Sequence, residues 1–197
     1  MAPFPTTDEL LGEMEERGHA LFMNDSRDYN LNLIATRDPD PRMDQFGCVM
    51  SVIWSYGGDL NHFNYRITTL PGSYYMKVRL LNHEGCAILK PGQYRGVYTT
   101  GLHRGKYLAL CQRRGPVTVY RDGDRDNEFD MEPEMERTGR FGINIHRCGR
   151  DGLVPRVGAN SAGCLVFQSH RDFDHFMKII ILAEENWGDR FSLTLLD

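Results

Sequence analysis

Short runs of β-branched and aromatic residues, each closed by turn residues, dominate the chain between residues 29 and 121. YNLNLIATR alternates apolar and polar positions, and FGCVMSVIWSY is rich in Val, Ile and Trp before the turn GGD. Alternation with a period of two places successive side chains on opposite faces of a strand. Further strand candidates are FNYRITTL, YYMKVRLL, GCAILKPGQYRGVY, KYLALCQR, PVTVYR, FGINIH, GCLVF and RFSLTLLD. A chain with this pattern is expected to fold mainly into β-structure.

Two helices are predicted, one near each end of the chain. Thr6 with Glu9 three residues later forms a capping-box pattern, and apolar residues follow it at helical spacing. Residues 171–186 form the second predicted helix, because their apolar positions recur every three or four residues. The apolar stripe of this helix consists of Phe173, Phe176, Met177, Ile180 and Ile181.

The composition of the 197 residues is that of an ordinary globular protein, with 41% hydrophobic, 11% aromatic and 25% charged residues. We expect a single domain over residues 1–197, with a helical segment at 1–28 and a polar surface loop at 121–140. The formal net charge of −4 gives no general footprint for nucleic acid, and no apolar run reaches the length of a membrane span. Neither nucleic acid nor a membrane is therefore an expected partner.

The cysteines indicate a reducing compartment. They are an odd number without a CxxC pair, which is untypical of a disulfide framework. The N-terminal residues MAPFPTTDELLGEMEERGHA lack the basic, apolar and small-residue order of a signal peptide. We therefore expect synthesis in the cytoplasm without a signal peptide. The five cysteines are Cys48, Cys86, Cys111, Cys148 and Cys164.

The strongest chemical pattern is a histidine that ends one strand and a cysteine that opens the next. His146 closes FGINIH, and Cys164 stands eighteen positions later in NSAGCLVF. Cysteine reacts as its thiolate, and a partner imidazole can take the thiol proton and later protonate the leaving amine. Gly163 allows backbone amides to approach a substrate carbonyl, as an oxyanion hole requires, and Ser161 positions the loop or the base. The pattern predicts Cys164 as nucleophile and His146 as base.

GINIH, the glycine-rich loop after it and SAGC together resemble the catalytic motif of the L,D-transpeptidases, the YkuD-like domain, over residues 139–173. In that family a histidine, a loop and Ser/Thr-His-Gly-Cys form a cysteine enzyme that acts on peptidoglycan stem peptides. The resemblance implies a β-sandwich-like catalytic core without cofactor or metal, in which Cys164 attacks a stem-peptide carbonyl. The stretch AILKPGQYRGVYTTGLHRGKYLALCQ is also similar to phage- and bacteria-associated relatives with NIHR and SAGC.

Two positions depart from the family's pattern. Ala162 stands where the family has a histidine beside the glycine, and Val166 stands where Asn or Arg usually follows the cysteine by two positions. Base and nucleophile are retained, but the auxiliary histidine is missing. The resemblance therefore favours an L,D-carboxypeptidase- or endopeptidase-like hydrolase over an L,D-transpeptidase. Because the N-terminus lacks a signal-peptide pattern, we expect such a wall enzyme to be a phage lysin or a bacterial toxin that reaches the cell wall or periplasm after lysis or specialised secretion, with a delivery or immunity partner.

Four polar residues are predicted to contact the substrate. Arg147 and Arg156 lie in the loop between base and nucleophile, where a guanidinium group can bind the carboxylate of a stem peptide bidentately. Asn160 lies just before the nucleophile turn, and His103 lies in the basic loop TTGLHRGKY, which we expect to line the cleft.

A zinc site is an alternative interpretation of the same residues. His146, Cys148 and Cys164 supply three ligands of types that zinc accepts, with water as a fourth ligand. A non-catalytic binding or structural protein that retains the fold is a second alternative, and it is favoured by Ala162 and Val166.

The acidic stretch DGDRDNEFD allows a calcium-binding interpretation. Asp122, Asp124 and Asp126 occupy positions one, three and five of an EF-hand-like loop. Asn127 replaces the glycine of position six, and Pro133 at position twelve cannot supply the bidentate carboxylate. We expect a solvated, turn-rich connection, with a looser calcium site as the alternative.

Overall fold

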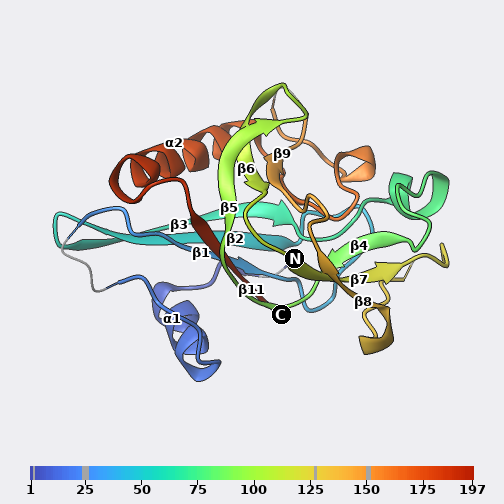
Figure 1. The fold of residues 1–197 in the computed structure, drawn as a ribbon, viewed down its shortest axis with the longest axis horizontal. Coiled ribbons are helices and arrows are strands. Elements are labelled where there is room, and N and C mark those ends of the chain that lie inside the picture. Colours follow the sequence, from blue (N-terminus) through green and yellow to red (C-terminus); the bar gives the residue numbers. More distant parts are fainter. Residues whose placement is uncertain (2, 24–26, 127, 150–151) are drawn as a thin grey trace.

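The chain folds into a closed barrel of eight strands with a small three-stranded sheet beside it (Figure 1). The computed structural model describes residues 1, 3–23, 27–126, 128–149 and 152–197. The expected mainly β architecture is confirmed, but the large sheet closes on itself and is not specifically a sandwich of two layers. In order around the barrel the strands are β1 (Asn32–Thr36), β11 (Phe191–Leu196), β5 (Gly92–His103), β6 (Tyr107–Gln112), β9 (Ile145–Arg147), β10 (Leu165–Phe167), β3 (Asp59–Thr68) and β2 (Cys48–Tyr56).

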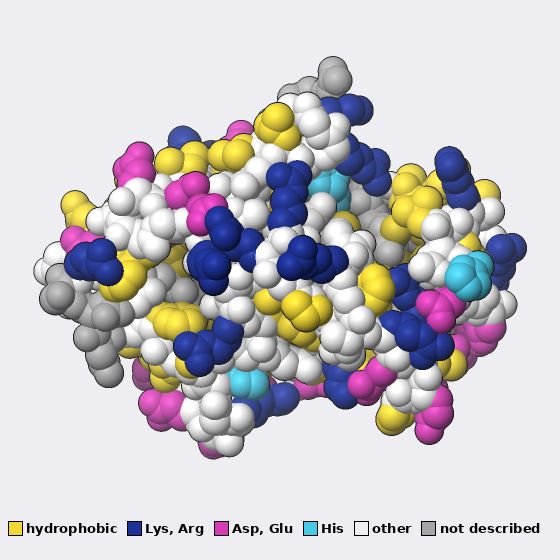
Figure 2. Space-filling model, viewed as in Figure 1, with side chains coloured by type: hydrophobic (Ala, Val, Ile, Leu, Met, Phe, Trp, Pro, Cys, Tyr) yellow, Lys and Arg dark blue, Asp and Glu magenta, His cyan; other side chains and the backbone are white. Residues whose placement is uncertain are grey.

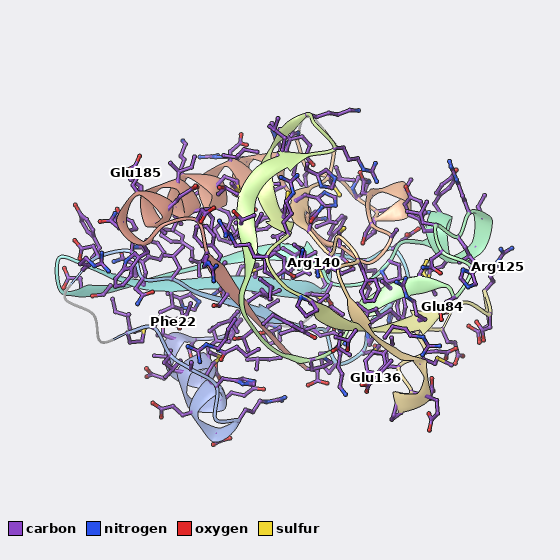
Figure 3. All side chains as sticks on the ribbon, in the orientation of Figure 1. Phe22, Glu84, Arg125, Glu136, Arg140 and Glu185 are labelled. Carbon is purple, nitrogen blue, oxygen red and sulfur yellow. The ribbon has the colours of Figure 1, made fainter. Side chains whose placement is uncertain are left out.

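The small sheet consists of β4 (Cys86–Leu89), β7 (Val117–Asp122) and β8 (Glu136–Gly139), all paired antiparallel. β6 and β7 follow one another through a short turn, yet they belong to different sheets. The surface loop predicted at residues 121–140 is partly wrong, because its last part forms β8 and pairs with β7. The short 3-10 helix η2 (Pro133–Met135) precedes β8, and Figure 3 shows Arg140 where the chain leaves this sheet for the barrel.

The two predicted helices are α1 (Thr7–Glu16) and α2 (His170–Trp187), which lie on opposite sides of the strands (Figure 1). The capping box of Thr6 and Glu9 is present at the start of α1. The predicted stripe of α2 is confirmed except at Ile181, which is 40% exposed because it lies at the edge of the buried face. Within the described ranges, no helix combines the length and hydropathy needed to cross a bilayer.

Both faces of the strands between the helices are buried. Alternate residues of the barrel strands pack with the apolar face of α2 in the main core. On the opposite face, Ile34, Ile53 and Leu196 pack against Leu10 and Met14 of α1. The first seven residues of β2 are all buried and, apart from Ser51, apolar, since a strand covered on both faces needs no polar alternation.

The strand predicted for YYMKVRLL is wrong. Residues Tyr74–Val78 form a π-helical turn, η1, in which the amides of Tyr75 and Met76 both donate to the carbonyl of Gly72. These two side chains are adjacent in sequence and both buried, which a strand with one buried face does not allow. Gly72 starts the turn in close contact with Gly158, whose carbonyl oxygen would lie 2.1 Å from a Cβ added at Gly72.

One buried amide side chain holds the segment that leads into β9. Gln112 is 4% exposed. Its Oε1 accepts hydrogen bonds from the backbone amides of Phe141, Gly142 and Ile143 at 3.1, 2.8 and 3.1 Å. Its Nε2 donates to the carbonyl of Gly139 at 3.0 Å. The predicted strand FGINIH is therefore regular only at β9. Over residues 141–143, the side chain of Gln112 supplies the hydrogen bonds that a neighbouring strand would otherwise supply.

We expect Gln112→Leu to lower the free energy of unfolding by about 2–4 kcal/mol, because each buried amide donor left unpaired costs about 1–3 kcal/mol. Denaturant unfolding followed by tryptophan fluorescence measures the change. Gln45→Leu, at an exposed position, is the control and is expected to stay within about 0.5 kcal/mol of the wild type. An unchanged unfolding midpoint for Gln112→Leu would contradict this role.

Candidate active site

Cys164 and His146 line the same cavity, which has a volume of about 420 Å³. The cavity lies where the barrel meets the small sheet, because its wall also includes Cys86 and Ala87 of β4 and Arg121 of β7. The two predicted catalytic residues, far apart in sequence, are thus brought to one concave surface.

The parallel pairing of β9 with β10 produces this arrangement. Ile145 lies opposite Leu165, and His146 lies opposite Val166. Ile145 and Leu165 belong to the main core, so alternation directs His146 and the residue before Leu165, Cys164, to the outer face of the barrel. The predicted two-sided character of FGINIH is confirmed for Ile145 and His146, which belong to β9.

The backbone fixes the tautomer of His146. Its Nδ1 lies 3.0 Å from the carbonyl oxygen of Arg147, which can only accept a hydrogen bond, so Nδ1 carries the proton and Nε2 is the basic nitrogen. The hydroxyl of Tyr107 donates to the same carbonyl at 3.3 Å. Burial, reinforced by the neighbouring His103, lowers the pKa of His146 to about 3. His146 is therefore neutral at physiological pH.

Cys164 differs from the other cysteines because it is partly exposed, whereas the other four are buried. Its Sγ donates a hydrogen bond to the carbonyl of Gly142 at 3.4 Å. Burial of the sulfur raises the pKa of Cys164 to about 11, although the amide of Asn144 and the charge of Arg104 act in the opposite direction. The resting site thus holds a neutral thiol and a neutral imidazole, and not the thiolate–imidazolium pair that the sequence interpretation assumes.

A second histidine stacks on the predicted base. The rings of His103 and His146 lie 4.1 Å apart between centroids, with 23° between their planes. The amide of Gln112 donates to Oδ1 of Asn144 at 2.9 Å, which leaves Nδ2 of Asn144 to donate to Nδ1 of His103 at 3.3 Å. His103 therefore carries its proton on Nε2 and can act there as a donor. The sequence places His103 at the cleft, but its contact with His146 depends on the tertiary fold.

The structure places two of the other three predicted substrate contacts at the cavities and the third outside both. Asn160 lines the cavity of Cys164 and also a neighbouring cavity of about 580 Å³. Arg147 lines the neighbouring cavity, where its guanidinium group lies 4.3 Å from the ring centroid of Tyr107. Arg156 is exposed, belongs to neither cavity lining, and lies close enough to Asp44 for its charge to favour that carboxylate.

Arg104 is a site residue that sequence reasoning missed. It lines both cavities and occupies the left-handed region at φ 51°, between β5 and β6. Gly105 follows at φ 71°, and Lys106 donates its amide to the carbonyl of His103, which is the geometry of a tight hairpin turn. A non-glycine residue is uncommon at this position, so HRGK between two alternating strands is a signal that could have identified it. Figure 2 shows Lys and Arg side chains gathered across the middle of the face that carries β5.

Ser161 shapes the nucleophile turn. Its hydroxyl donates to the carbonyl of Cys164 at 2.9 Å and accepts the amide of Gly163 at 3.1 Å. Its carbonyl accepts the amide of Gly72 at 2.9 Å. Two roles are predicted for Ser161, positioning the loop or positioning the base, and its hydrogen bonds position the turn of the loop. Because the amide of Gly163 is already engaged, the amide of Cys164 is the better candidate for an oxyanion donor.

Gly163 is needed because of a close approach by the small sheet. It adopts φ +126°, and a Cβ added there would lie 2.1 Å from the carbonyl oxygen of Ala87 in β4. The sequence interpretation assigns Gly163 to contact with a substrate carbonyl. In the structure the neighbour of this glycine is the backbone of β4, so Gly163 sets how tightly the two sheets meet at the nucleophile.

Asp44 is a second residue that the sequence analysis missed. Its carboxylate accepts the amide and hydroxyl of Ser73 at 2.8 and 2.6 Å and the amide of Gly158 at 2.8 Å. Burial alone would raise the pKa of Asp44, but these hydrogen bonds outweigh it and lower the pKa from its usual value. Asp44 therefore ties η1 to the short helix η3 (Gly158–Asn160), which immediately precedes the nucleophile turn.

The three residues of the zinc interpretation are not gathered around one point. Among the described residues, the group whose ligand atoms lie within 4.8 Å of one another is Asp122, Asp124 and Asp130. Cys148 is buried in an apolar cluster, and burial raises the pKa of its thiol to about 12. Binding zinc between His146, Cys148 and Cys164 would thus require these side chains to move.

Comparisons of the chain with protein-family models, with curated proteins and with solved structures give no match.

We expect Gly163→Ala to lower the free energy of unfolding by about 2–4 kcal/mol, for two reasons. The added methyl group would overlap the backbone of β4, and φ +126° is a backbone conformation that residues other than glycine rarely adopt. Gly58→Ala is the matched control: φ is +88°, but no atom lies within 4 Å of the added Cβ. The control is expected to cost about 1 kcal/mol. Equal losses in denaturant unfolding would show that close approach at Gly163 has no energetic importance.

The raised pKa of Cys164 predicts a steep pH profile for its alkylation. The thiolate reacts and is a minor species below a pKa of about 11, so the rate with iodoacetamide should rise about tenfold per pH unit between pH 7 and 10. Peptide mass spectrometry after timed quenching separates Cys164 from the four buried cysteines. A rate that is already constant at neutral pH would instead indicate a preformed thiolate–imidazolium pair.

Proposed function

We propose that this protein is a cysteine acyl-transfer enzyme that acts on amide bonds of peptidoglycan stem peptides. The observation that carries the proposal is the shared cavity of Cys164 and His146. Cys164 is the partly exposed cysteine of the chain, and the tautomer of His146 leaves Nε2 free of a proton. The resemblance of GINIH and SAGC to L,D-transpeptidases supports the choice of substrate, and implies a core related to their β-sandwich.

Acylation starts from the neutral pair. The Sγ atom of Cys164 attacks the scissile carbonyl carbon while its proton passes to Nε2 of His146, so that the new S–C bond forms as the S–H bond breaks. The amide of Cys164 stabilises the developing oxyanion. When the tetrahedral intermediate collapses, the C–N bond breaks and the imidazolium protonates the leaving amine. The product is a thioester with Cys164.

Deacylation regenerates the thiol. A water molecule attacks the thioester carbonyl, His146 takes its proton, and the thiolate that leaves is reprotonated by the imidazolium. An amine in place of water would give transpeptidation. Ala162, at the cavity wall, packs against the apolar cluster of Tyr75, Met76 and Cys86, and offers no polar group to orient an amine. We therefore favour an L,D-carboxypeptidase- or endopeptidase-like hydrolase.

Substrate binding would use the wall shared by the two cavities. Arg104 supplies a guanidinium group that can hold a stem-peptide carboxylate, with Arg147 in the neighbouring cavity. His103 can donate from Nε2, and Asn160 offers its side-chain amide oxygen, because its Nδ2 donates to the carbonyl of Val157 at 2.9 Å.

A cell-wall substrate implies that the protein reaches the wall or periplasm after lysis or specialised secretion, as a phage lysin or a delivered toxin would. A delivery or immunity partner belongs to the same proposal.

Purified muropeptides test the proposal. We expect the wild type to release terminal D-Ala or to split a crosslink, and Cys164→Ala and His146→Gln to lose at least about 10²-fold in rate. Cys111→Ser is the control, because Cys111 is buried outside both cavities and serine can retain the hydrogen bond to the carbonyl of Gly101. Mass spectrometry of the products names the bond, and amino-acid exchange would reveal transpeptidation. Absence of any product with the wild type would refute the wall-enzyme proposal.

A non-catalytic binding protein is the second candidate. It is favoured by the burial of Cys164 and His146. Burial raises the pKa of the thiol and lowers the pKa of the imidazole, so both groups stay neutral. Binding of muropeptides by the wild type and equally by Cys164→Ala, without turnover by either, would select this alternative.

A further inference from the structure

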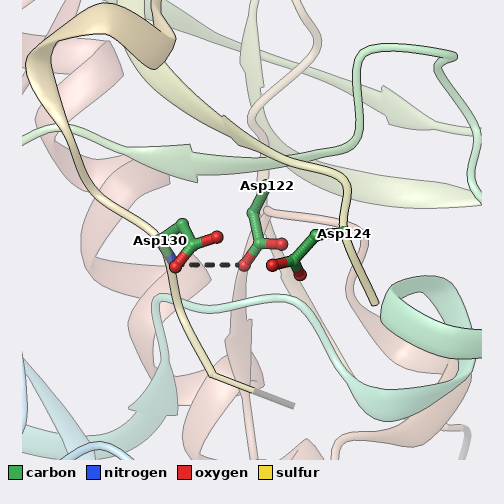
Figure 4. Close-up of side chains that lie close together, drawn as sticks. All are labelled: Asp122, Asp124 and Asp130. Carbon is green, nitrogen blue, oxygen red and sulfur yellow. Dashed lines mark hydrogen bonds between the residues drawn. The ribbon is translucent and has the colours of Figure 1, made fainter. Parts of the chain in front are cut away.

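Three aspartate side chains meet at the end of β7, where the chain leaves the small sheet (Figure 4). The ligand atoms of Asp122, Asp124 and Asp130 all lie within 4.8 Å of one another. Asp124 is exposed and Asp130 is half-buried, whereas Asp122 is only 1% exposed. We call these three residues the acidic trio. They correspond to positions one, three and nine of the EF-hand-like pattern.

Asp122 has a buried oxygen without a partner. Its Oδ2 accepts the backbone amide of Asp130 at 3.2 Å, but its Oδ1 is enclosed and has no hydrogen-bond partner among the described residues. Figure 4 shows the second carboxylate oxygen of Asp122 directed toward Asp124. A buried carboxylate oxygen is costly unless a donor or a cation meets it, so this atom points to a missing ligand.

The surrounding charges do not neutralise the acidic trio. Burial, with the negative charges of Asp130, Asp124 and Asp126, raises the pKa of Asp122 to about 6. Arg121 precedes it in β7, but its guanidinium group lies 4.5 Å from the ring centroid of Phe141. Figure 3 shows Arg125, the basic residue within the loop, at the outer edge of the molecule. The acidic trio is therefore a concentration of negative charge that favours a cation.

We propose that the acidic trio binds a calcium ion, with Oδ1 of Asp122 as the buried ligand, carboxylate oxygens of Asp124 and Asp130 beside it, and water completing the shell. Two oxygens bound to one calcium ion at about 2.3–2.6 Å lie at most about 5 Å apart, so separations within 4.8 Å are compatible with a shared ion. Magnesium binds at about 2.0–2.1 Å with near-ideal octahedral geometry and retains several waters. The ligand set contains only carboxylates, which suit hard cations and not zinc or copper.

The residues that form the acidic trio differ from those that the sequence pattern suggests. Asp126, predicted at position five, is outside the acidic trio, and its Oδ1 instead accepts the amide of Glu128 at 2.7 Å. Asn127 lies outside the described residues. Asp130, which the sequence analysis did not single out, takes part because the loop returns its amide to Asp122.

An ion here would stiffen one wall of the candidate active site. Asp122 pairs with Cys86, and a Cβ added at Gly85 would lie 2.1 Å from the carbonyl oxygen of Asp122. Gly85, Cys86 and Arg121 all line the cavity of Cys164. Calcium would therefore join the loop after β7 to the strands that face the nucleophile, and it would stabilise the folded chain.

Calorimetric titration of the full chain with CaCl₂, after EDTA treatment and exchange into metal-free buffer, tests the site. We expect one site with a Kd between about 10⁻⁶ and 10⁻³ M and weaker binding of MgCl₂. At calcium concentrations near 100 Kd, Tm should rise by about 5–10 °C. Absence of both heat and a Tm shift up to about 10 mM CaCl₂ would overturn the proposal, and magnesium binding as tight as calcium would overturn the assignment to calcium.

Asp124→Asn and Asp126→Asn form a matched pair. Each removes one carboxylate from the same loop, and each asparagine can retain the acceptor for the amide two residues later, at 3.1 Å for Asp124 and 2.7 Å for Asp126. Asp124→Asn is expected to weaken calcium binding at least about tenfold, and Asp126→Asn no more than about threefold. Equal weakening by both variants would indicate diffuse attraction by the loop and refute a defined site. Circular dichroism in EDTA verifies that both variants fold.

Discussion

The parallel pairing of β9 with β10 is the contact on which the candidate site depends. Because His146 and Val166 lie opposite each other, Cys164 must emerge on the same outer face as the histidine. Parallel neighbours cannot be joined by a tight hairpin, so the chain between them has to cross over as a long loop. That loop carries Asn160 and Ser161. Its shape is held because Asp44 accepts the amide of Gly158, and because the amide of Gly72, just before η1, donates to the carbonyl of Ser161. The backbone pairing thus fixes which side chains meet, and the loop contacts fix how they meet.

The small sheet makes this exposed face into a cavity. β4 passes so close to the nucleophile turn that only glycine fits at position 163, and the same strand supplies Cys86 and Ala87 to the cavity wall. The enclosure has an electrostatic consequence. Desolvation raises the pKa of Cys164 and lowers that of His146, so enclosure opposes charge separation in the resting site. Arg104, strained at the tip of its hairpin, is the nearby positive charge that favours the thiolate.

Local sequence patterns predicted the elements well where short-range chemistry decides them. The capping box at Thr6, the helix at residues 171–186 and the alternation of Ile145 and His146 all reappear, because a cap and a hydrophobic period act within a few residues. The strand predicted for YYMKVRLL failed because the contact of Gly72 with Gly158 turns the chain, and these residues are far apart in sequence. The regular strand expected at residues 141–144 gave way to the side chain of Gln112 for the same reason.

By itself, the sequence determined a mainly β chain with a helix near each end, and it placed a cysteine and a histidine at adjacent strand ends. It also indicated His103 and Asn160 as neighbours of the site. Only the tertiary structure decided that the strands close into a barrel, that β6 and β7 belong to different sheets, and that His103 stacks on His146. It alone brought Arg104, Asp44 and Asp130 to their contacts. The reason is that strand order, burial and charge at a site arise from contacts between distant segments, which local periodicity does not encode.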